Sequence, residues 1–498
     1  MTSNESVAAV DLGSNSFQLL VARVVDDTHF HVVDRLRERV VLAAGLDEQQ
    51  CLSEKAQARA VACLERFGQR LRELPLHRVR AVGTSALRQA GNTRSFLLEA
   101  QAALGHPIEI IGGSEEARLI YLGVSHSLAD DNGRRLVVDI GGGSTECVLG
   151  ERFEPIRTDS LGMGCVSYSL RFFTDGKIRG EDFRRAEIAA RLKLEPIERR
   201  FIDSGWDSCV GSSGTILTID ALLRQHGWSE RGINLTGLRQ LKKALIAAGT
   251  AAKVAAIPGV PAERASVLPG GVAILTALFE ALGVEQMETT TGSMREGLLY
   301  DLLGRIRHED VRDRTIRQFC ARYQVDMKQA DRVEQLALHC LDQLAGGWSI
   351  DPVFGRQVIG WAARLHEIGL SIAFAGYHRH SAYLVANSDM PGFSRADQEL
   401  LATMLLGQRK KLGREIFAAL PAQEVELALR LTVLLRLAVR LSRSRSPKPQ
   451  PPFTVTARKN GLELSFPADW IEGHPLTHAD LIEEASKLQG VGFELRVR

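Results

Sequence analysis

Two glycine-rich turns carry residues suited to chemistry on phosphate groups. One is Asp11-Leu-Gly-Ser-Asn-Ser16 and the other is Asp139-Ile-Gly-Gly-Gly-Ser-Thr-Glu146, and each stands between apolar runs typical of strands. Glycines expose backbone N–H groups that bind phosphate oxygens, so Gly142, Gly143 and Ser144 are candidates for such a nest. Asp139 and Glu146 are placed to hold Mg²⁺ against those oxygens. The alternative is a tight hairpin with incidental glycines, and the repetition of the motif favours the phosphate site.

Neither turn matches the common nucleotide-binding or hydrolase motifs. No GxxxxGK(S/T) sequence occurs, and the glycine spacing and the strand that follows exclude a Rossmann fingerprint. The segment Gly211-Ser-Ser-Gly214 does not match the GxSxG motif of a hydrolase nucleophile either.

Two further polar segments stand at predicted helix starts. Gly83-Thr-Ser85 precedes one helical pattern, and Gly211-Ser-Ser-Gly214, which contains Ser213, precedes another. Helix N-termini bind anions, but the same residues are ordinary N-caps, and the sequence leaves both interpretations open. Arg88 lies one turn into the first of these helices. It can bind a phosphate through two N–H groups or pair with a surface acid.

Adjacent carboxylates, Glu115 and Glu116, open the helix that is predicted after Ile110-Ile-Gly-Gly113. Acidic residues in a first turn complement the helix dipole. One of them can instead serve as a general base for water. The sequence alone does not choose between these roles.

The spacing of the motifs indicates an internal repeat. Asp11 and Asp139 are 128 residues apart, and so are Gly83 and Gly211. Two matches at one offset, each in the same predicted setting, favour a duplicated α/β unit. We therefore expect two similar α/β lobes with a cleft between them.

The chain changes character near Val311, where glycine becomes sparser and helical periodicities dominate. Beyond a proline-rich stretch, Asn460-Gly461 predicts a hairpin with a type I′ turn. Helices are predicted over residues 330–344, 357–373, 396–406 and 424–441. The expected domains are two α/β lobes at 1–125 and 126–304, an all-α domain at 305–445 and a small C-terminal α/β domain at 446–498.

The composition is that of a globular protein. The 498 residues are 45% hydrophobic and 24% charged, which excludes general disorder. The net charge of +2 gives no indication of a nucleic-acid partner. Residues 427–457 hold six basic and no acidic side chains, and a solvated helix face is favoured there over a polyanion track.

The sequence predicts a soluble protein of a reducing compartment. The uncharged stretch Ala265–Phe279 is shorter than the roughly 18 residues of a membrane span. The N-terminus lacks the features of a secretory signal. Seven scattered cysteines without a CxxC pair fit a cytoplasmic protein.

Taken together, the motifs closely resemble the exopolyphosphatase/guanosine pentaphosphate phosphatase family. The segments that carry the resemblance are Asp11–Ser16, Gly83–Arg88, Glu115–Arg118, Asp139–Glu146, Gly211–Thr215, Leu365–Gly369, His378–Tyr383 and Asn387–Phe393. The resemblance covers nearly the whole chain. It implies duplicated actin-like (ribonuclease H-like) lobes, an HD-like helical domain and a small C-terminal domain.

The resemblance also implies roles for individual residues. By position, Glu116 is expected to be the catalytic base, and Asp139 and Glu146 are expected to bind Mg²⁺. Phosphate-binding residues implied in the same way are Asn15, Arg88, Gly142, Gly143, Ser144, Ser213 and His378. The family is typically a homodimer in which polyphosphate follows a basic channel. A peripheral association with the membrane is compatible with the absence of a spanning segment.

The leading functional hypothesis is therefore a Mg²⁺-dependent exopolyphosphatase that releases orthophosphate from the ends of inorganic polyphosphate. The close alternative is hydrolysis of guanosine pentaphosphate (pppGpp) to the tetraphosphate (ppGpp) by the same site. An ATP-dependent kinase or chaperone of the same fold is a third class, for which Pro269-Gly270-Gly271 is the candidate adenosine contact. A catalytically silent regulator is disfavoured because the three acidic residues are all present.

Overall fold

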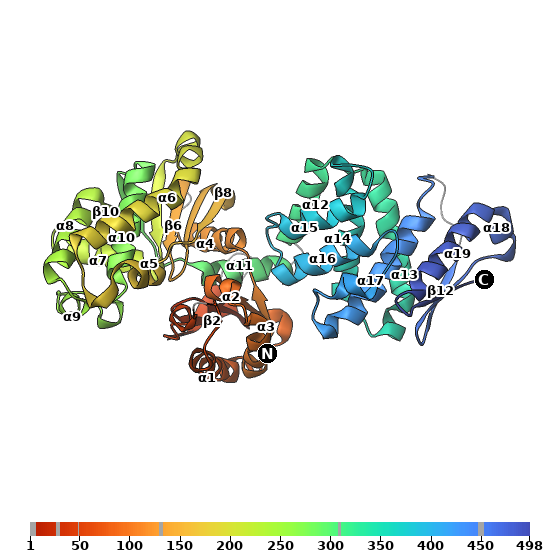
Figure 1. Cartoon of the computed structure of the whole chain (residues 1–498), viewed down its shortest axis with the longest axis horizontal. Coiled ribbons are helices and arrows are strands. Elements are labelled where there is room, and N and C mark those ends of the chain that lie inside the picture. Colours follow the sequence, from red (N-terminus) through yellow and green to blue (C-terminus); the bar gives the residue numbers. More distant parts are fainter. Residues whose placement is uncertain (1–5, 26–29, 48, 129–132, 307–309, 447–452) are drawn as a thin grey trace. The chain divides into compact units, whose positions relative to one another are not determined.

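The computed structural model describes the chain except residues 1–5, 26–29, 48, 129–132, 307–309 and 447–452. The chain divides into two units, Met1–Asp310 and Val311–Arg498 (Figure 1). The boundaries that the sequence suggests at 125, 304 and 445 stay a prediction.

The first lobe of the N-terminal unit is built on a five-stranded sheet of order β3-β2-β1-β4-β5 within the described residues. β1 is antiparallel to β2 and parallel to β4. Its strands are β1 (Ser6–Leu12), β2 (Phe17–Val24), β3 (Phe30–Glu38), β4 (Val79–Gly83) and β5 (Ile108–Ile110). Its helices are α1 (Glu54–Leu71), α2 (Ser85–Gln89), α3 (Thr93–Leu104) and α4 (Gly113–Ser127).

The second lobe repeats this plan with a sheet of order β10-β11-β9-β6-β7-β8. Its strands are β6 (Arg134–Ile140), β7 (Thr145–Glu151), β8 (Glu154–Leu161), β9 (Ser208–Ser212), β10 (Ile233–Asn234) and β11 (Gln286–Thr289). Its helices are α5 (Cys165–Phe172), α6 (Gly180–Ser204), α7 (Ser213–Gln225), α8 (Leu235–Ala248), α9 (Ala251–Val254), α10 (Leu268–Leu282) and α11 (Met294–Ile306).

Strand pairing confirms the duplication. In the first lobe Asp11 of β1 is paired with Gln18 of β2. In the second lobe Asp139 of β6 is paired with Glu146 of β7, so the offset of 128 residues is kept by both members of the pair. The repeat is less regular at the neighbouring strands β4 and β9. Asp11 is paired with Val82 of β4, whereas Asp139 is paired with Ser212 of β9. Gly83 and Gly211 are therefore 128 residues apart in the sequence, but their strand positions relative to Asp11 and Asp139 differ by two residues.

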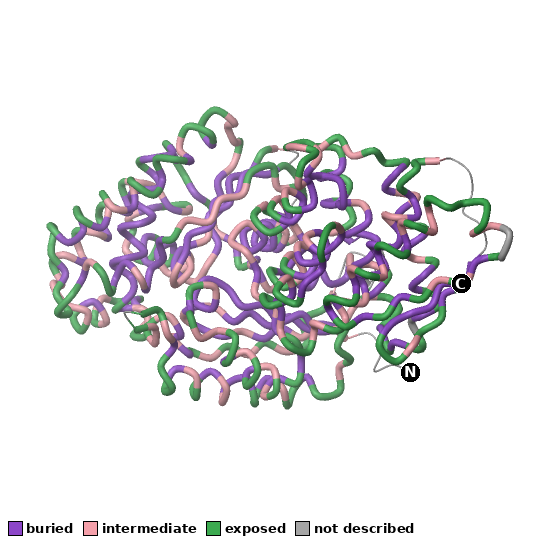
Figure 2. Tube along the Cα trace, turned by 45° about the vertical axis from the view of Figure 1, so that its right-hand side comes forward, coloured by how far each residue is buried: buried purple, intermediate pink, exposed green. Residues whose placement is uncertain are grey.

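Helices α4 and α11 form a layer between the two sheets. One continuous core contains side chains of α4 and α11 together with strand residues of both lobes, among them Val7 of β1 and Val137 of β6. The two helices cross closely, because Cβ atoms on Gly123 or Gly297 would collide with the backbone of the other helix. The outer faces of the sheets are covered by separate cores. Figure 2 shows the buried segments following the strands and the inner helix faces.

The C-terminal unit begins with a bundle of helices and ends in a small α/β domain. One core runs through both parts. The helices are α12 (Val311–Arg322), α13 (Met327–Trp348), α14 (Pro352–Leu365), α15 (Tyr377–Asn387), α16 (Arg395–Gly407) and α17 (Ala422–Leu441). The small domain contains β12 (Thr454–Arg458), β13 (Gly461–Ser465), α18 (Ala468–Gly473), α19 (Pro475–Gln489) and β14 (Glu494–Val497).

Two expectations about the secondary structure of this unit are wrong. The single helix over 357–373 ends at Leu365 and is followed by a 3₁₀ turn at Ile368–Ser371. The hairpin forms, but its two loop residues are Lys459 and Asn460. Neither is among the described residues with positive φ, so the turn is not of type I′.

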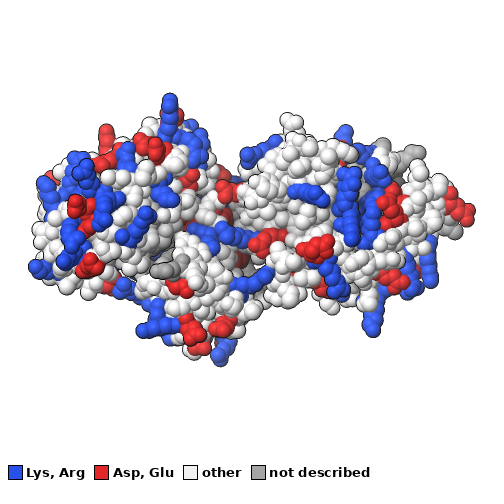
Figure 3. All heavy atoms as spheres, in the orientation of Figure 1, with Lys and Arg blue, Asp and Glu red and all other residues white. Residues whose placement is uncertain are grey.

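The basic side chains of α17 and the residues that follow it do not form the solvated helix face that was expected. They do not form an open path for a polyanion either. Arg436 is 1% exposed and pairs with Glu484 of α19. Arg440 and Arg443 pair with Asp480 of α19. These ion pairs fasten α17 to α19, and Figure 3 shows basic and acidic side chains interspersed on the visible face of the molecule. Among the described residues, no helix is long and apolar enough to cross a membrane.

Candidate active site

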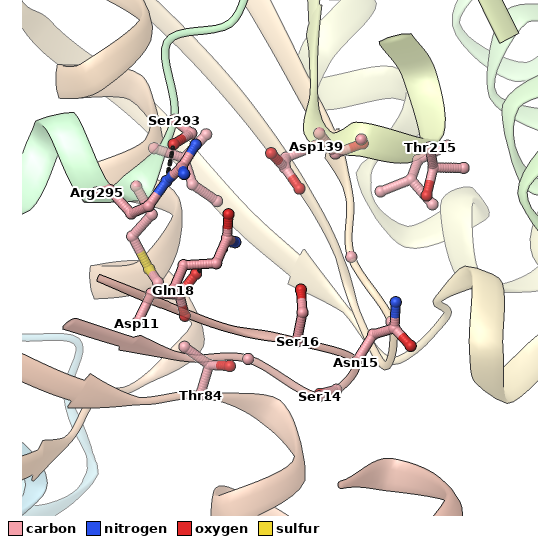
Figure 4. Close-up of a pocket in the computed structure, with 18 of the residues that line it drawn as sticks. Asp11, Ser14, Asn15, Ser16, Gln18, Thr84, Asp139, Thr215, Ser293 and Arg295 are labelled. Atoms are coloured by element: carbon pink, nitrogen blue, oxygen red, sulfur yellow. Dashed lines mark hydrogen bonds between the residues drawn. The ribbon is translucent and has the colours of Figure 1, made fainter. Parts of the chain in front are cut away.

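A cavity of about 280 Å³ lies between the two lobes, at the carboxyl ends of β1, β6 and β9. Crevices at this end of the strands are the usual ligand sites of α/β sheets. Figure 4 shows Asp11 and Gln18 from the first lobe facing Asp139 from the second, with Arg295 above them. Predicted site residues that line the cavity are Asn15, Glu116, Asp139, Gly142, Ser144 and Ser213.

Two aspartates of the cavity hold protons more tightly than usual. Burial raises the pKa of Asp11 to about 7, and the nearby charges of Glu116 and Asp139 add to the shift. Burial, with Glu116, also raises the pKa of Asp139 to about 7, although a hydrogen bond from Ser212 opposes the shift. Carboxylates crowd together in this way where a cation or a proton transfer is part of the function.

This donor set fits a hard divalent cation such as Mg²⁺. Asp11 Oδ1 and Asn15 Oδ1 are buried without hydrogen-bond partners. Mg²⁺ is usually held by one or two carboxylates together with water and substrate phosphates. Among the residues that the structure describes, no three His, Cys, Asp or Glu side chains group closely enough to enclose a metal by themselves. The arrangement suits a cation that is shared with the substrate.

Glu116 lies in the first turn of α4 and its carboxylate enters the cavity. Arg88 of α2 donates from Nη1 to Glu116 Oε2 at 2.6 Å and to the carbonyl oxygen of Ile111 at 3.0 Å. Arg88 does not line the cavity itself. In this state the arginine orients the expected base rather than presenting its guanidinium to a ligand.

The backbone at Ser213 is strained. Its φ is 85°, in the left-handed region that favours glycine. Ser213 begins α7, and its Oγ accepts a hydrogen bond from the N–H of Ile216 at 3.3 Å. Strain of this kind persists where the surrounding structure imposes it, and it clusters at functional sites. Ser213 is also one of the residues that line the cavity.

Besides Arg88, three predicted site residues lie outside the cavity. Glu146 is buried behind Asp139 and accepts a hydrogen bond from Ser160 Oγ at 2.8 Å, and burial, Glu116 and Asp139 raise its pKa well above the usual value. Gly143 lines a second cavity on the other side of its loop. His378 lies in the C-terminal unit, where burial and Arg379 lower its pKa to about 4.

The basic residues of the cavity were not predicted from the sequence. Arg37 on β3, Arg264 in the loop before α10 and Arg295 at the start of α11 line it. Burial lowers the pKa of Arg264, and the positive charge of Arg37 lowers it further. The absence of a side chain at Gly214 leaves room for the Arg264 guanidinium. These positive charges suit a ligand with several phosphate groups.

Behind the cavity, α4 and α11 are joined by a network of charged side chains. Asp301 of α11 accepts hydrogen bonds from Arg118, from Arg80 and, at 2.9 Å, from Arg305 Nε. Arg118 also binds both oxygens of Glu115 at 2.7 and 2.9 Å. Burial alone would raise the pKa of Asp301, but the arginines hold it well below its usual value. Glu115 thus anchors the helix turn from which Glu116 points into the cavity.

Replacing Asp11 by asparagine is expected to stabilise the metal-free protein above neutral pH. Asp11 binds a proton up to about pH 7 when folded but only to about pH 4 when unfolded, so the free energy of unfolding falls between these values as pH rises. A neutral amide removes this cost. Thermal unfolding without divalent cations should show a midpoint higher by ~2–5 °C at pH 8, and the difference should shrink as the pH falls toward 4. An equal shift with exposed Asp203→Asn would contradict this cause.

Comparison with known families agrees with the site. The model of the Ppx/GppA phosphatase family matches residues 20–306, and the model of Ppx/GppA phosphatase domain III matches residues 311–485. The chain belongs to the Ppx/GppA phosphatase family. The resemblance read from the motifs is thereby confirmed at the level of the family.

Members of the Ppx/GppA family resemble this chain over its full length. A guanosine-5'-triphosphate,3'-diphosphate pyrophosphatase of Aeromonas hydrophila is 40% identical over 98% of both chains. Its counterpart in Vibrio vulnificus is 41% identical over 98% of this chain and 97% of its own.

Two solved structures resemble more than half of the chain. An exopolyphosphatase from Cytophaga hutchinsonii is 26% identical, with a TM-score of 0.55, over 60% of this chain and 98% of its own. The Aquifex aeolicus PPX-GPPA enzyme is 26% identical, with a TM-score of 0.51, over 59% and 99%. These likenesses confirm the expected fold class.

The glycines proposed for a kinase-like adenosine contact have a packing role in this Ppx/GppA chain. Gly270 and Gly271 lie inside α10 and are fully buried. A Cβ atom on Gly270 would come within 2.6 Å of the Cys165 carbonyl oxygen. Their lack of side chains brings α10 close to α5, so they offer no surface to a nucleotide base.

Proposed function

We propose that this enzyme hydrolyses guanosine pentaphosphate to guanosine tetraphosphate and orthophosphate. The observation that carries the proposal is the similarity to two guanosine-5'-triphosphate,3'-diphosphate pyrophosphatases at 40 and 41% identity over nearly the full length. The cavity supports it, because carboxylates for the reaction and arginines for additional phosphates line the same space.

In the proposed reaction, a water oxygen attacks the terminal 5′ phosphorus while Glu116 accepts a proton from that water. The bond from this phosphorus to the bridging oxygen breaks, and the tetraphosphate leaves with the electron pair. Arg88 keeps the Glu116 carboxylate turned toward the cavity through the 2.6 Å hydrogen bond. Backbone N–H groups of the Gly141–Gly143 turn and side chains such as Ser144 orient the phosphoryl oxygens. Orientation and charge stabilisation are the main demands of phosphoryl transfer.

Mg²⁺ is the proposed cofactor, held by Asp139 with Glu146 behind it and with Asp11 on the opposite lobe. The cation would neutralise charge on the phosphate oxygens. The support for this proposal is the buried Asp11 oxygen without a partner and the acidic lining of the cavity.

Arg37 and Arg264 are proposed to bind the phosphates that do not react. They belong to different lobes and line the same cavity as the carboxylates. A guanosine derivative with a diphosphate on its 3′ oxygen carries a second anionic group away from the reacting end. Arginines bind such groups through paired N–H donors.

A second candidate, the exopolyphosphatase activity expected from the sequence, is favoured by the similarity to the Cytophaga hutchinsonii exopolyphosphatase. The bond that breaks is a terminal phosphoric anhydride in both substrates. The two functions therefore differ in what the arginines bind, and the same cavity serves either.

The test is orthophosphate release from guanosine pentaphosphate, GTP and long-chain polyphosphate by the purified full-length chain. We expect Mg²⁺-dependent release from the pentaphosphate with the highest kcat/KM, and none after chelation with EDTA. Turnover of polyphosphate with no turnover of the pentaphosphate would establish the second candidate instead. Release from neither the pentaphosphate nor polyphosphate, with ATP turned over in a parallel assay, would contradict both.

Replacing Arg264 by glutamine is expected to raise KM for the pentaphosphate by about 10–100-fold, because hydrogen bonds to charged groups contribute ~1.5–3 kcal/mol. KM for GTP, which lacks the 3′ diphosphate, should change much less. Steady-state kinetics on both substrates measures the difference. Arg239→Gln, at an exposed pair with Glu280, is the control. Equal changes for the two substrates would exclude a role for Arg264 in binding the 3′ end.

We also propose a cytoplasmic location, which fits the seven unpaired cysteines, six of them buried.

A further inference from the structure

A second cavity of about 340 Å³ lies directly behind the phosphate loops. It is formed by the start of α2 and the segment around Ala43 from the first lobe, and by Gly143 and α5 from the second. Its size is within the roughly 300–1,000 Å³ range of small-molecule sites. None of the site residues discussed above, other than Gly143, lines it.

The wall between this rear cavity and the candidate active site is one residue thick. Ser14 lines both cavities, while Gly142 lines the front one and its neighbour Gly143 lines the rear one. A Cβ atom on Gly143 would lie 2.8 Å from Ser85 Oγ and 3.2 Å from Ser14 Oγ. The gap between the loops is therefore lined by hydroxyl groups and kept narrow by the absence of a side chain at Gly143.

The Ser14 side chain closes this gap through a weak restraint. Its Oγ accepts a hydrogen bond from the N–H of Ala86 at 3.2 Å. A single hydrogen bond of this kind contributes only ~0.5–1.5 kcal/mol. The route proposed below requires rotation of this one small side chain or a slight separation of the two loops.

The two cavities differ in the groups that line them. The front cavity is lined by the carboxylates of Asp11, Glu116 and Asp139 and by the arginines at 37, 264 and 295. Among the described residues that line the rear cavity there is no carboxylate. Hydrogen-bond donors there are the hydroxyls of Ser14, Ser85 and Ser167, the carboxamides of Gln50 and Gln89, and the guanidinium of Arg171. Hydroxyl, amide and guanidinium groups are the donors that a phosphate ion requires.

The substrate makes a rear exit useful. In the proposed complex, the reacting phosphate would lie between the loops and the remainder of the substrate would extend toward the arginines. As long as that remainder is bound, it would block the front exit for orthophosphate.

We propose that orthophosphate leaves the active site through the rear cavity, past Ser14 and Gly143, and binds transiently near Arg171. This inference rests on the proposed hydrolysis only for the identity of the substrate. It makes release of orthophosphate independent of release of the larger product.

The proposal is tested with two variants at the mouth of the rear cavity, Arg171→Glu and Leu170→Trp. Both side chains line that cavity, both positions are exposed, and neither residue lines the front cavity. Arg199→Glu is the matched control for charge, because Arg199 is 92% exposed and lines neither cavity.

The kinetic measurement compares chemistry with release in the first turnover on guanosine pentaphosphate. Rapid acid quench reports cleavage on the enzyme, and a fluorescent phosphate-binding protein reports orthophosphate in solution. In the two variants we expect an unchanged quench rate and a release rate at least tenfold lower, so that a burst appears in the quench trace alone. The control should match the wild type. Unchanged release in both variants overturns the proposal.

A second measurement separates this proposal from the proposed function. Isothermal titration of the full-length chain with inorganic phosphate needs no turnover, and Arg171→Glu should weaken binding about tenfold. If binding is unaffected by Arg171→Glu and Leu170→Trp, the rear site does not exist, even if the pentaphosphate is hydrolysed. If binding depends on Arg171 but the pentaphosphate is not cleaved, the rear site stands and the proposed substrate is wrong.

Discussion

Replacement of Glu116 by glutamine is expected to lower kcat by about 10²–10⁴-fold, the contribution typical of a general base. Glutamine keeps the shape of the side chain and can still accept the hydrogen bond from Arg88, but it cannot take a proton from water. KM should change little, because the binding groups of the cavity are untouched. The thermal midpoint should stay close to that of the wild type.

The measurement is steady-state release of orthophosphate by both proteins at saturating Mg²⁺. Glu99→Gln, at an exposed position of α3, is the control and should retain full activity. A variant at Glu116 that keeps more than a tenth of the wild-type kcat would exclude this residue as the base.

Arg88→Gln adds a test of how the base is held. If Arg88 acts by orienting Glu116 through the 2.6 Å contact, the double variant should be no slower than Glu116→Gln alone. Additive losses would instead indicate that Arg88 binds phosphate independently, as the sequence suggested.

Replacement of Asp301 by asparagine should give the largest loss of stability. Asp301 is 3% exposed in its side chain and is the acceptor for Arg80, Arg118 and Arg305. Removing one member of a buried ion-pair network typically costs ~3–5 kcal/mol, because the buried charges that remain lose part of their compensation. We expect the thermal midpoint of the N-terminal unit to fall by ~5–10 °C.

Differential scanning calorimetry of the full-length chain measures this effect. Asp159→Asn is the matched control, since Asp159 pairs with the half-exposed Arg200 at 3.2 Å. A surface pair of this type contributes about 0–1 kcal/mol. If both variants lose the same small amount, the network does not stabilise the contact between α4 and α11.

The acidic half of the candidate site was predictable in part, because it consists of local motifs. Asp139 precedes a glycine turn and lines the cavity as expected, whereas its strand partner Glu146 does not line it, and Asp11 of the matching turn was not named as a site residue. Glu116 was identified through the family resemblance and also lines the cavity. A chain segment of ten residues is enough to specify such positions.

The basic half was not predictable, because its members have no local signature. Arg37 lies on an edge strand and Arg264 in a loop, and only the packing of the two lobes brings them to one cavity. The same limit explains the error in the basic stretch of α17. Whether Arg436 faces solvent or a partner depends on Glu484, which lies 48 residues away.

The end of helix α14 was also not predictable from the local sequence. The apolar periodicity continues past Leu365, but the polypeptide turns at His366 and Glu367. The His366 ring bonds to the carbonyl oxygen of Ala363 at 2.6 Å, and the His366 carbonyl accepts hydrogen bonds from Ser381 and Gln408. The contacts with Ser381 and Gln408 come from distant segments, so the periodicity alone could not indicate the end of the helix.

The layer that α4 and α11 form between the two sheets affects how the chain folds during its synthesis. Helix α4 is complete at Ser127, yet α11, which covers the same core and neutralises its arginines, extends to Ile306. At roughly 5–20 residues per second, a ribosome needs on the order of 10–35 s to add the intervening segment. During that interval the first lobe has an uncovered apolar face and charged groups without their partner. We expect the nascent lobe to be a target of holding chaperones, and to become resistant to protease only after α11 has left the exit tunnel.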